Sequence, residues 1–178
     1  NQPLVFNDVF RFEFRFIIKK ENSGYAPIFG HSQGTQSVNR ILVSKTNAKT
    51  IINIGGSSSG NSLTYNYPFQ FETEYVFTLE RSTDNDVYLT INNEPTVLIG
   101  NNSSSWAGAN PTGETKIGAT GGRFFTGQIF YADLGEGNLF SLNEGSGNIV
   151  TADNNIQGEI KTNKDIDYIN NVMWEKIW

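Results

Sequence analysis

The chain has 178 residues, 13% of them aromatic, and a formal net charge of -5, a composition that suits one β-rich domain. The negative charge and the scattered Lys and Arg residues argue against a nucleic-acid partner, because a phosphate backbone would be repelled. With no cysteine and one histidine, the chain cannot form a thiolate or multi-histidine zinc site by itself. No apolar run approaches the roughly 20 residues of a membrane-spanning helix, so we expect no membrane insertion.

The clearest pattern is the alternation from residue 9 to residue 18, which predicts a strand with one apolar and one charged face. The apolar face carries Phe10, Phe12, Phe14, Phe16 and Ile18, and the charged face carries Arg11, Glu13 and Arg15. Four phenylalanine rings on one face need a second layer of structure to cover them. The strand therefore predicts a sandwich of two sheets.

Shorter segments predict the strands that follow. Pro27 predicts either that the strand at residues 25–31 lies at a sheet edge or that the proline stands at the start of this strand. Residues 37–44 alternate again, and a polar turn connects them to a strand at residues 50–54. The glycine- and serine-rich stretch 55–60 lacks the lysine of a phosphate-binding loop, so it predicts a hairpin tip.

Residues 74–82 and 86–92 predict a hairpin, because the polar residues between them favour a turn. A further turn at residues 92–95 makes this a three-stranded meander. From residue 100 to residue 113 the periodicity is lost, which predicts a long polar loop that contains a lone tryptophan, Trp106. Such loops on rigid sandwiches often carry recognition.

Strand patterns resume at residues 115–118, 127–134 and 138–142. The closing stretch places apolar residues at helical spacing from residue 169 to residue 177. This spacing predicts a short C-terminal helix, and the alternative is a β-tail that packs Trp174 and Trp178 on the sandwich.

Three strings in chain order are EYVFTLERSTDNDVYLTINNEPTV from Glu74, IGATGGRFFTGQIFYADL from Ile117 and LFSLNEGSGN from Leu139. Together they resemble the laminin-G-like or concanavalin-A-like jelly-roll modules of bacterial surface proteins and of phage tail fibres and tail spikes. The resemblance implies an all-β, two-sheet antiparallel jelly-roll β-sandwich over residues 1–178, as a single domain. It also implies an extracellular or virion-surface location. Because the chain starts without an initiator methionine, we expect a fragment of a longer protein.

One segment departs from the family pattern. In many such modules a string of the type Leu-x-Glu-Gly-Ser-Gly precedes the first long strand, whereas residues 142–147 stand near the end of this chain. We hypothesise that the chain is cut or permuted. The hypothesis predicts that the strand before Gly145 lies beside the strand after Asp8.

Calcium is the metal for which the turns offer ligands, because it binds converging oxygen atoms. Asp84 and Asp86 lie in one acid-rich turn, and the long loop could add Asn101, Asn102 and Asn110. The alternative is that these side chains are solvated turn residues.

Catalysis is not expected. Glycoside hydrolysis needs two facing carboxylates. The glucanases of the superfamily that this sequence resembles carry them on a Glu-x-Asp-x-x-Glu strand, and no such string occurs here. Closely spaced acids occur only beside turns, as Glu72 with Glu74, Asp84 with Asp86, and Asp165 with Asp167. His31 has no Gly-x-Ser-x-Gly nucleophile elbow to serve, so we expect a structural histidine at a strand edge.

Carbohydrate binding needs an aromatic ring that stacks on a pyranose and polar side chains that bond its hydroxyls. The candidate ligand-binding residues are Trp106, Tyr65, Tyr67, Asn101, Asn102 and Asn110. Trp106 is the strongest of them, and its alternative role is to fold back as an anchor for the loop. For Phe124 and Phe125 the resemblance implies a place at the start of a core strand, with one ring buried.

These observations predict a non-catalytic recognition module of a phage tail fibre, tail spike or adhesin that binds a cell-surface glycan or polysaccharide. The alternative is a structural module that spaces or trimerises a fibre, as a homotrimer without a glycan ligand. A glycan-degrading enzyme is the third hypothesis.

Overall fold

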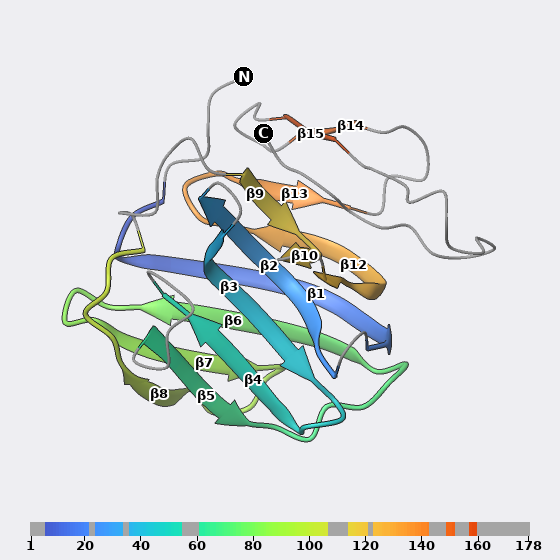
Figure 1. Ribbon diagram of the computed structural model, residues 1–178, viewed down its shortest axis with the longest axis horizontal. Helices are drawn as coiled ribbons and strands as arrows, with labels where there is room; N and C mark the ends of the chain where they lie inside the picture. The colour runs from blue at the N-terminus through green and yellow to red at the C-terminus, as the bar shows by residue number, and fades with distance from the viewer. Residues whose placement is uncertain are drawn as a thin grey trace.

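The computed structural model describes residues 6–21, 24–33, 36–54, 61–106, 114–120, 123–142, 149–151 and 157–159. In these residues two antiparallel sheets pack face to face (Figure 1), so the predicted all-β, two-sheet sandwich is confirmed. The described ranges contain no helix, and therefore none that is long and apolar enough to cross a membrane. The predicted C-terminal helix and its β-tail alternative fall on residues outside these ranges.

The six-stranded sheet has the order β13-β12-β1-β6-β7-β8. Its strands are β1 (Phe10–Lys20), β6 (Glu74–Arg81), β7 (Asp86–Ile91), β8 (Val97–Asn101), β12 (Thr126–Asp133) and β13 (Leu139–Ser141). Strands β6, β7 and β8 form the predicted meander. The phenylalanine-rich strand β1 lies inside the sheet, between β6 and β12.

The five-stranded sheet has the order β5-β4-β3-β2-β9. Its strands are β2 (Ala26–Gln33), β3 (Gln36–Ser44), β4 (Lys49–Asn53), β5 (Ser62–Asn66) and β9 (Glu114–Ile117). Two short hairpins complete the described strands: β10 (Ala119–Thr120) with β11 (Arg123–Phe124), and β14 (Ile149–Thr151) with β15 (Gln157–Glu159). The predicted hairpin tip at residues 55–60 lies outside the described residues, and β4 and β5 pair as far as Asn53 and Ser62 on either side of it.

Strand β2 lies between β3 and β9, so an edge position is wrong and the alternative, a proline at the start of the strand, is right. Pro27 is the second residue of β2 and stands opposite Leu42 of β3. Pairing with β9 starts only at Phe29, so the ladder on that side does not need the N–H that proline lacks.

The core lies between the sheets and is centred on β1. Phe12, Phe14, Phe16 and Ile18 each expose 1% of their surface or less. Phe29 of the opposite sheet packs on this face, with ring centroids 5.8 Å from Phe12 and 6.3 Å from Phe14. The second sheet thus supplies the cover that the alternation in β1 demands.

The prediction that the strand before Gly145, which is β13, lies beside β1 is wrong. β13 pairs with β12, and β12 rather than β13 lies beside β1. The close approach of β12 to β1 depends on Gly127, where a Cβ atom would lie 2.0 Å from the Ile17 carbonyl oxygen. The permutation hypothesis therefore fails its structural test.

We expect Phe14→Ala to lower the free energy of unfolding by about 3–5 kcal/mol, because truncating a buried phenylalanine loses its burial and leaves a cavity. Urea denaturation with an unchanged m-value would measure the loss. Arg15→Ala on the exposed face of the same strand is the control and should cost far less. Equal losses for the two variants would contradict the assignment of the two faces.

Candidate functional site

Trp106 is buried, and this corrects the prediction that its ring binds a ligand. None of its surface is exposed. Its ring centroid lies 4.7 Å from that of Phe10, 5.5 Å from Phe12 and 5.8 Å from Phe29. The ring has no free face for a sugar, so Trp106 is the loop anchor that was the alternative interpretation.

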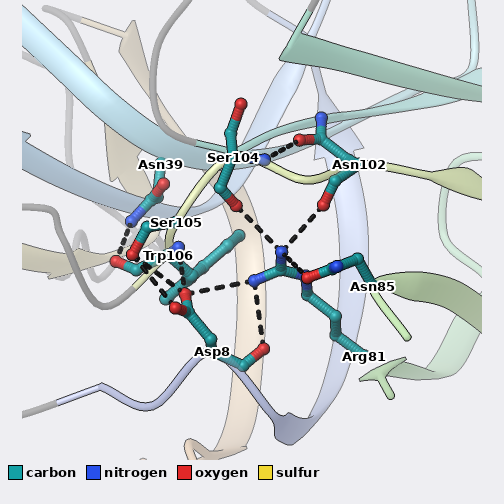
Figure 2. Close-up of polar contacts among 8 residues, drawn as sticks. All are labelled: Asp8, Asn39, Arg81, Asn85, Asn102, Ser104, Ser105 and Trp106. Atoms are coloured by element: carbon teal, nitrogen blue, oxygen red, sulfur yellow. Dashed lines mark hydrogen bonds and ion pairs between the residues drawn. The ribbon is translucent and has the colours of Figure 1, made fainter. Parts of the chain in front are cut away.

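A buried arginine, Arg81, holds the segment that leads to Trp106 (Figure 2). The Arg81 side chain is 1% exposed. Its Nη2 atom donates to the backbone carbonyl oxygens of Asn102 at 2.7 Å and Ser104 at 2.9 Å, and to Asn85 Oδ1 at 2.6 Å. These bonds satisfy backbone carbonyl groups of residues that follow the end of β8.

Asp8 completes this network from the segment before β1. Its Oδ1 atom and its backbone oxygen each accept a 3.1 Å hydrogen bond from Arg81 Nη1. The same carboxylate accepts the Trp106 backbone N–H at 2.6 Å and the Ser105 hydroxyl at 3.1 Å (Figure 2). The Asp8–Arg81 pair thus joins the start of β1, the end of β6 and the segment after β8.

The predicted calcium ligands meet, but an amide group bridges them. Asn101 Nδ2 donates to the Asp84 backbone oxygen at 2.7 Å and to Asp86 Oδ1 at 2.9 Å. Asn102 is buried, and its side chain accepts the Ser104 N–H. Within the described ranges no three His, Cys, Asp or Glu side chains are placed to hold a metal ion. Asn110 lies outside the described residues.

The two predicted tyrosines are partly buried and pack against the core from β5 and the segment that follows it. The Tyr67 hydroxyl donates to Glu94 Oε1 at 2.9 Å. Burial and this hydrogen bond raise the pKa of Tyr67 to about 12. Tyr65 and Tyr67 therefore contribute to the packing of this sheet edge. Among the described residues, neither forms a hydrogen bond with Asn101 or with the Asp84–Asp86 turn.

Two further side chains have the roles expected of them. Phe125 is buried, and its ring packs edge-on against Phe16 at 5.9 Å. His31 is 1% exposed, and its Nδ1 atom lies 3.0 Å from Thr115 Oγ1, as a structural histidine requires. The predicted edge position of His31 is wrong, because β2 lies inside its sheet, between β3 and β9.

A pocket of about 480 Å³ opens where the chain enters β1, a place that no sequence pattern indicates. Its walls come from three segments that are far apart in the sequence: Phe6, Asn7, Val9, Phe10, Arg11 and Phe12; Glu80, Arg81, Ser82 and Tyr88; and Leu134, Gly135 and Glu136. Phe10 and Phe12 stack with centroids 4.4 Å apart and give it an apolar wall.

Charged side chains form the polar part of the pocket. Arg11 Nε donates to Glu80 Oε1 at 2.9 Å, and Arg11 Nη2 donates to Glu13 Oε2 at 2.6 Å. Burial lowers the pKa of Arg11, but the hydrogen bonds and charges of Glu13 and Glu80 outweigh it and leave that pKa above its ordinary value. Glu136 accepts a hydrogen bond from the Asn7 side chain. These contacts hold the charged groups in place.

A second layer of contacts orients Glu13. Tyr131 donates its hydroxyl to Glu13 Oε1 at 2.5 Å, and Thr78 donates to Glu13 Oε2 at 3.2 Å. Burial raises the pKa of Glu13, but the hydrogen bonds from Tyr131 and Arg11 outweigh it and leave that pKa below its ordinary value. Glu13 is therefore a carboxylate held against Arg11.

The sequence pattern indicated only part of this pocket. The alternation in β1 placed Arg11 and Glu13 on the face away from the core, but no pattern linked them to Tyr88 or Glu136. Comparison of the sequence with models of protein families finds no match, and a search of curated proteins finds none either.

We expect Asp8→Ala to lower the free energy of unfolding by about 1.5–3 kcal/mol, because it leaves the buried Arg81 guanidinium without its counter-charge. Asp84→Ala is the control, since the Asp84 side chain is exposed and the hydrogen bonds at that residue use its backbone. Chemical denaturation of both variants is the measurement. A loss no greater in Asp8→Ala than in Asp84→Ala would contradict the role of the pair.

Proposed function

We propose that the protein is a non-catalytic carbohydrate-recognition module, and that the pocket at the start of β1 is its ligand site. One observation carries the proposal: a cavity of about 480 Å³ combines an aromatic wall with hydrogen-bonding side chains held in fixed positions. Small-molecule sites are typically about 300–1,000 Å³ and mostly apolar, with a few polar groups that orient the ligand.

The two kinds of wall suit the two kinds of surface on a sugar. Phe10 is only partly buried, and Val9 beside it is 50% exposed, so both can contact the apolar face of a pyranose. Arg11, Glu80 and Glu136 offer donors and acceptors for its hydroxyl groups. The ion pair between Arg11 and Glu80 fixes these groups before a ligand arrives, which lowers the entropy cost of binding.

Binding without catalysis fits the contacts of the pocket carboxylates. Glu80 accepts a hydrogen bond from Arg11 and Glu136 accepts one from Asn7, so each carboxyl group is held by a different protein side chain. Hydrolysis would need one of two facing carboxyl groups to act as a proton donor. The resemblance to tail-fibre and adhesin modules supports a cell-surface glycan as the ligand and an extracellular or virion-surface setting.

A glycan array, followed by calorimetry on the glycans that bind, tests the proposal. We expect Tyr88→Ala to weaken binding about tenfold, which corresponds to about 1.4 kcal/mol, because it removes an aromatic ring from the pocket wall. Leu98→Ala is the matched control: Leu98 stands opposite Tyr88 in β8, is 56% exposed and does not line the pocket.

Three results would contradict the proposal. No binding across a broad array would favour the structural, trimerising module, and light scattering would then be expected to show a homotrimer. Equal losses in Tyr88→Ala and Leu98→Ala would place the ligand elsewhere. Release of reducing sugar from a polysaccharide would show an enzyme.

A further inference from the structure

The charges around the pocket are unequal in how freely they can meet a ligand. Two carboxylates line it, those of Glu80 and Glu136, and both are solvent-accessible. Two arginines, Arg11 and Arg81, are also among the lining residues. Whether the pocket attracts anions or cations depends on how far these four groups are already neutralised.

Arg11 is held between two carboxylates. Its Nε atom is 2.9 Å from Glu80 and its Nη2 atom is 2.6 Å from Glu13, so one positive charge faces two negative charges. Glu13 is the more buried of the two partners, with 22% of its side chain exposed. An anionic ligand would have to compete with both carboxylates for this guanidinium.

Arg81 is far less available to a ligand than Arg11. Its Nη1 atom bonds Asp8 and its Nη2 atom bonds three oxygen atoms. Its third nitrogen, Nε, is buried and makes no hydrogen bond to the described residues. With 1% of its side chain exposed, Arg81 presents no charge that an anion in the pocket could reach.

The carboxylates, by contrast, keep acceptor capacity. Glu80 and Glu136 each use Oε1 for a hydrogen bond, and within the described part of the chain Oε2 of each accepts none. Glu80 has 46% of its side chain exposed. Two carboxylate oxygens are therefore open to a donor. The exposed guanidinium of Arg11 keeps only Nη1 without a hydrogen bond to the described residues, and its single charge already faces the carboxylates of Glu13 and Glu80.

We propose that this pocket selects sugars that carry a free, protonated amine and disfavours sugars that carry a carboxylate. The inference rests on the proposed function and adds the chemical class of the ligand. The ammonium group would bond Glu80 and Glu136, whose oxygen atoms suit its three donors. A uronic or sialic acid would instead meet an excess of negative charge, which the net charge of -5 on the chain reinforces.

Four related sugars separate the possibilities: glucose, glucosamine, N-acetylglucosamine and glucuronic acid. Each is titrated into isotopically labelled protein at about pH 6, where the amine is protonated. We expect glucosamine to bind about three- to tenfold more tightly than glucose or N-acetylglucosamine, and glucuronic acid to bind most weakly. The preference should shrink as salt is added, because exposed charges are screened.

Glu136→Gln keeps the shape of the side chain and removes one pocket charge, so it should weaken the binding of glucosamine by a larger factor than the binding of glucose. Glu72→Gln, an exposed position outside the pocket, is the control and should change neither. Glu136→Gln that alters all four affinities equally would contradict a charge-based selection.

The outcomes separate the two proposals. Equal affinity for all four sugars, or a preference for glucuronic acid, overturns the selection for amines and leaves carbohydrate recognition intact. Failure of all four sugars and of the array glycans to perturb the pocket amides, in protein whose spectrum shows it folded, overturns both.

Discussion

Burial of the apolar face of β1 is the constraint on which the rest of the molecule depends. Phe12, Phe14 and Phe16 can leave water only if a second sheet covers them, and Phe29 of β2 supplies that cover. The same alternation that directs the phenylalanines inward directs Arg11 outward to the pocket. One strand therefore organises both the core and the candidate site.

The Asp8–Arg81 pair fixes the positions of segments that lie outside the regular strands. Arg81 continues the inward-facing row of β6, but at the end of the sheet it meets backbone carbonyls and a carboxylate instead of apolar side chains. A buried guanidinium is tolerated there because its partners compensate the loss of hydration. The pair holds Trp106 over the end of the phenylalanine face and fixes the first residues of the pocket.

Periodicity predicted the strands, and it failed where contacts join distant segments. The alternation in β1, β6 and β7 has a local cause, so their faces and the meander were predictable. The burial of Trp106 depends on an Asp8 carboxylate 98 residues away, and a loop has no period that could show it. The pocket was missed for the same reason, since its walls combine three segments. The position of β13 was mispredicted because it was inferred from the order of segments in the family, whereas the close fit of Gly127 places β12 against β1.

The most direct test of the account is to map the ligand site by amide chemical shifts while a glycan that binds on the array is titrated into labelled protein. We expect saturable shifts at residues 6–12, 80–88 and 134–136, the three segments that form the pocket. Saturable shifts confined to the sheet edge around Tyr65 and Tyr67, with the pocket amides unmoved, would contradict the account.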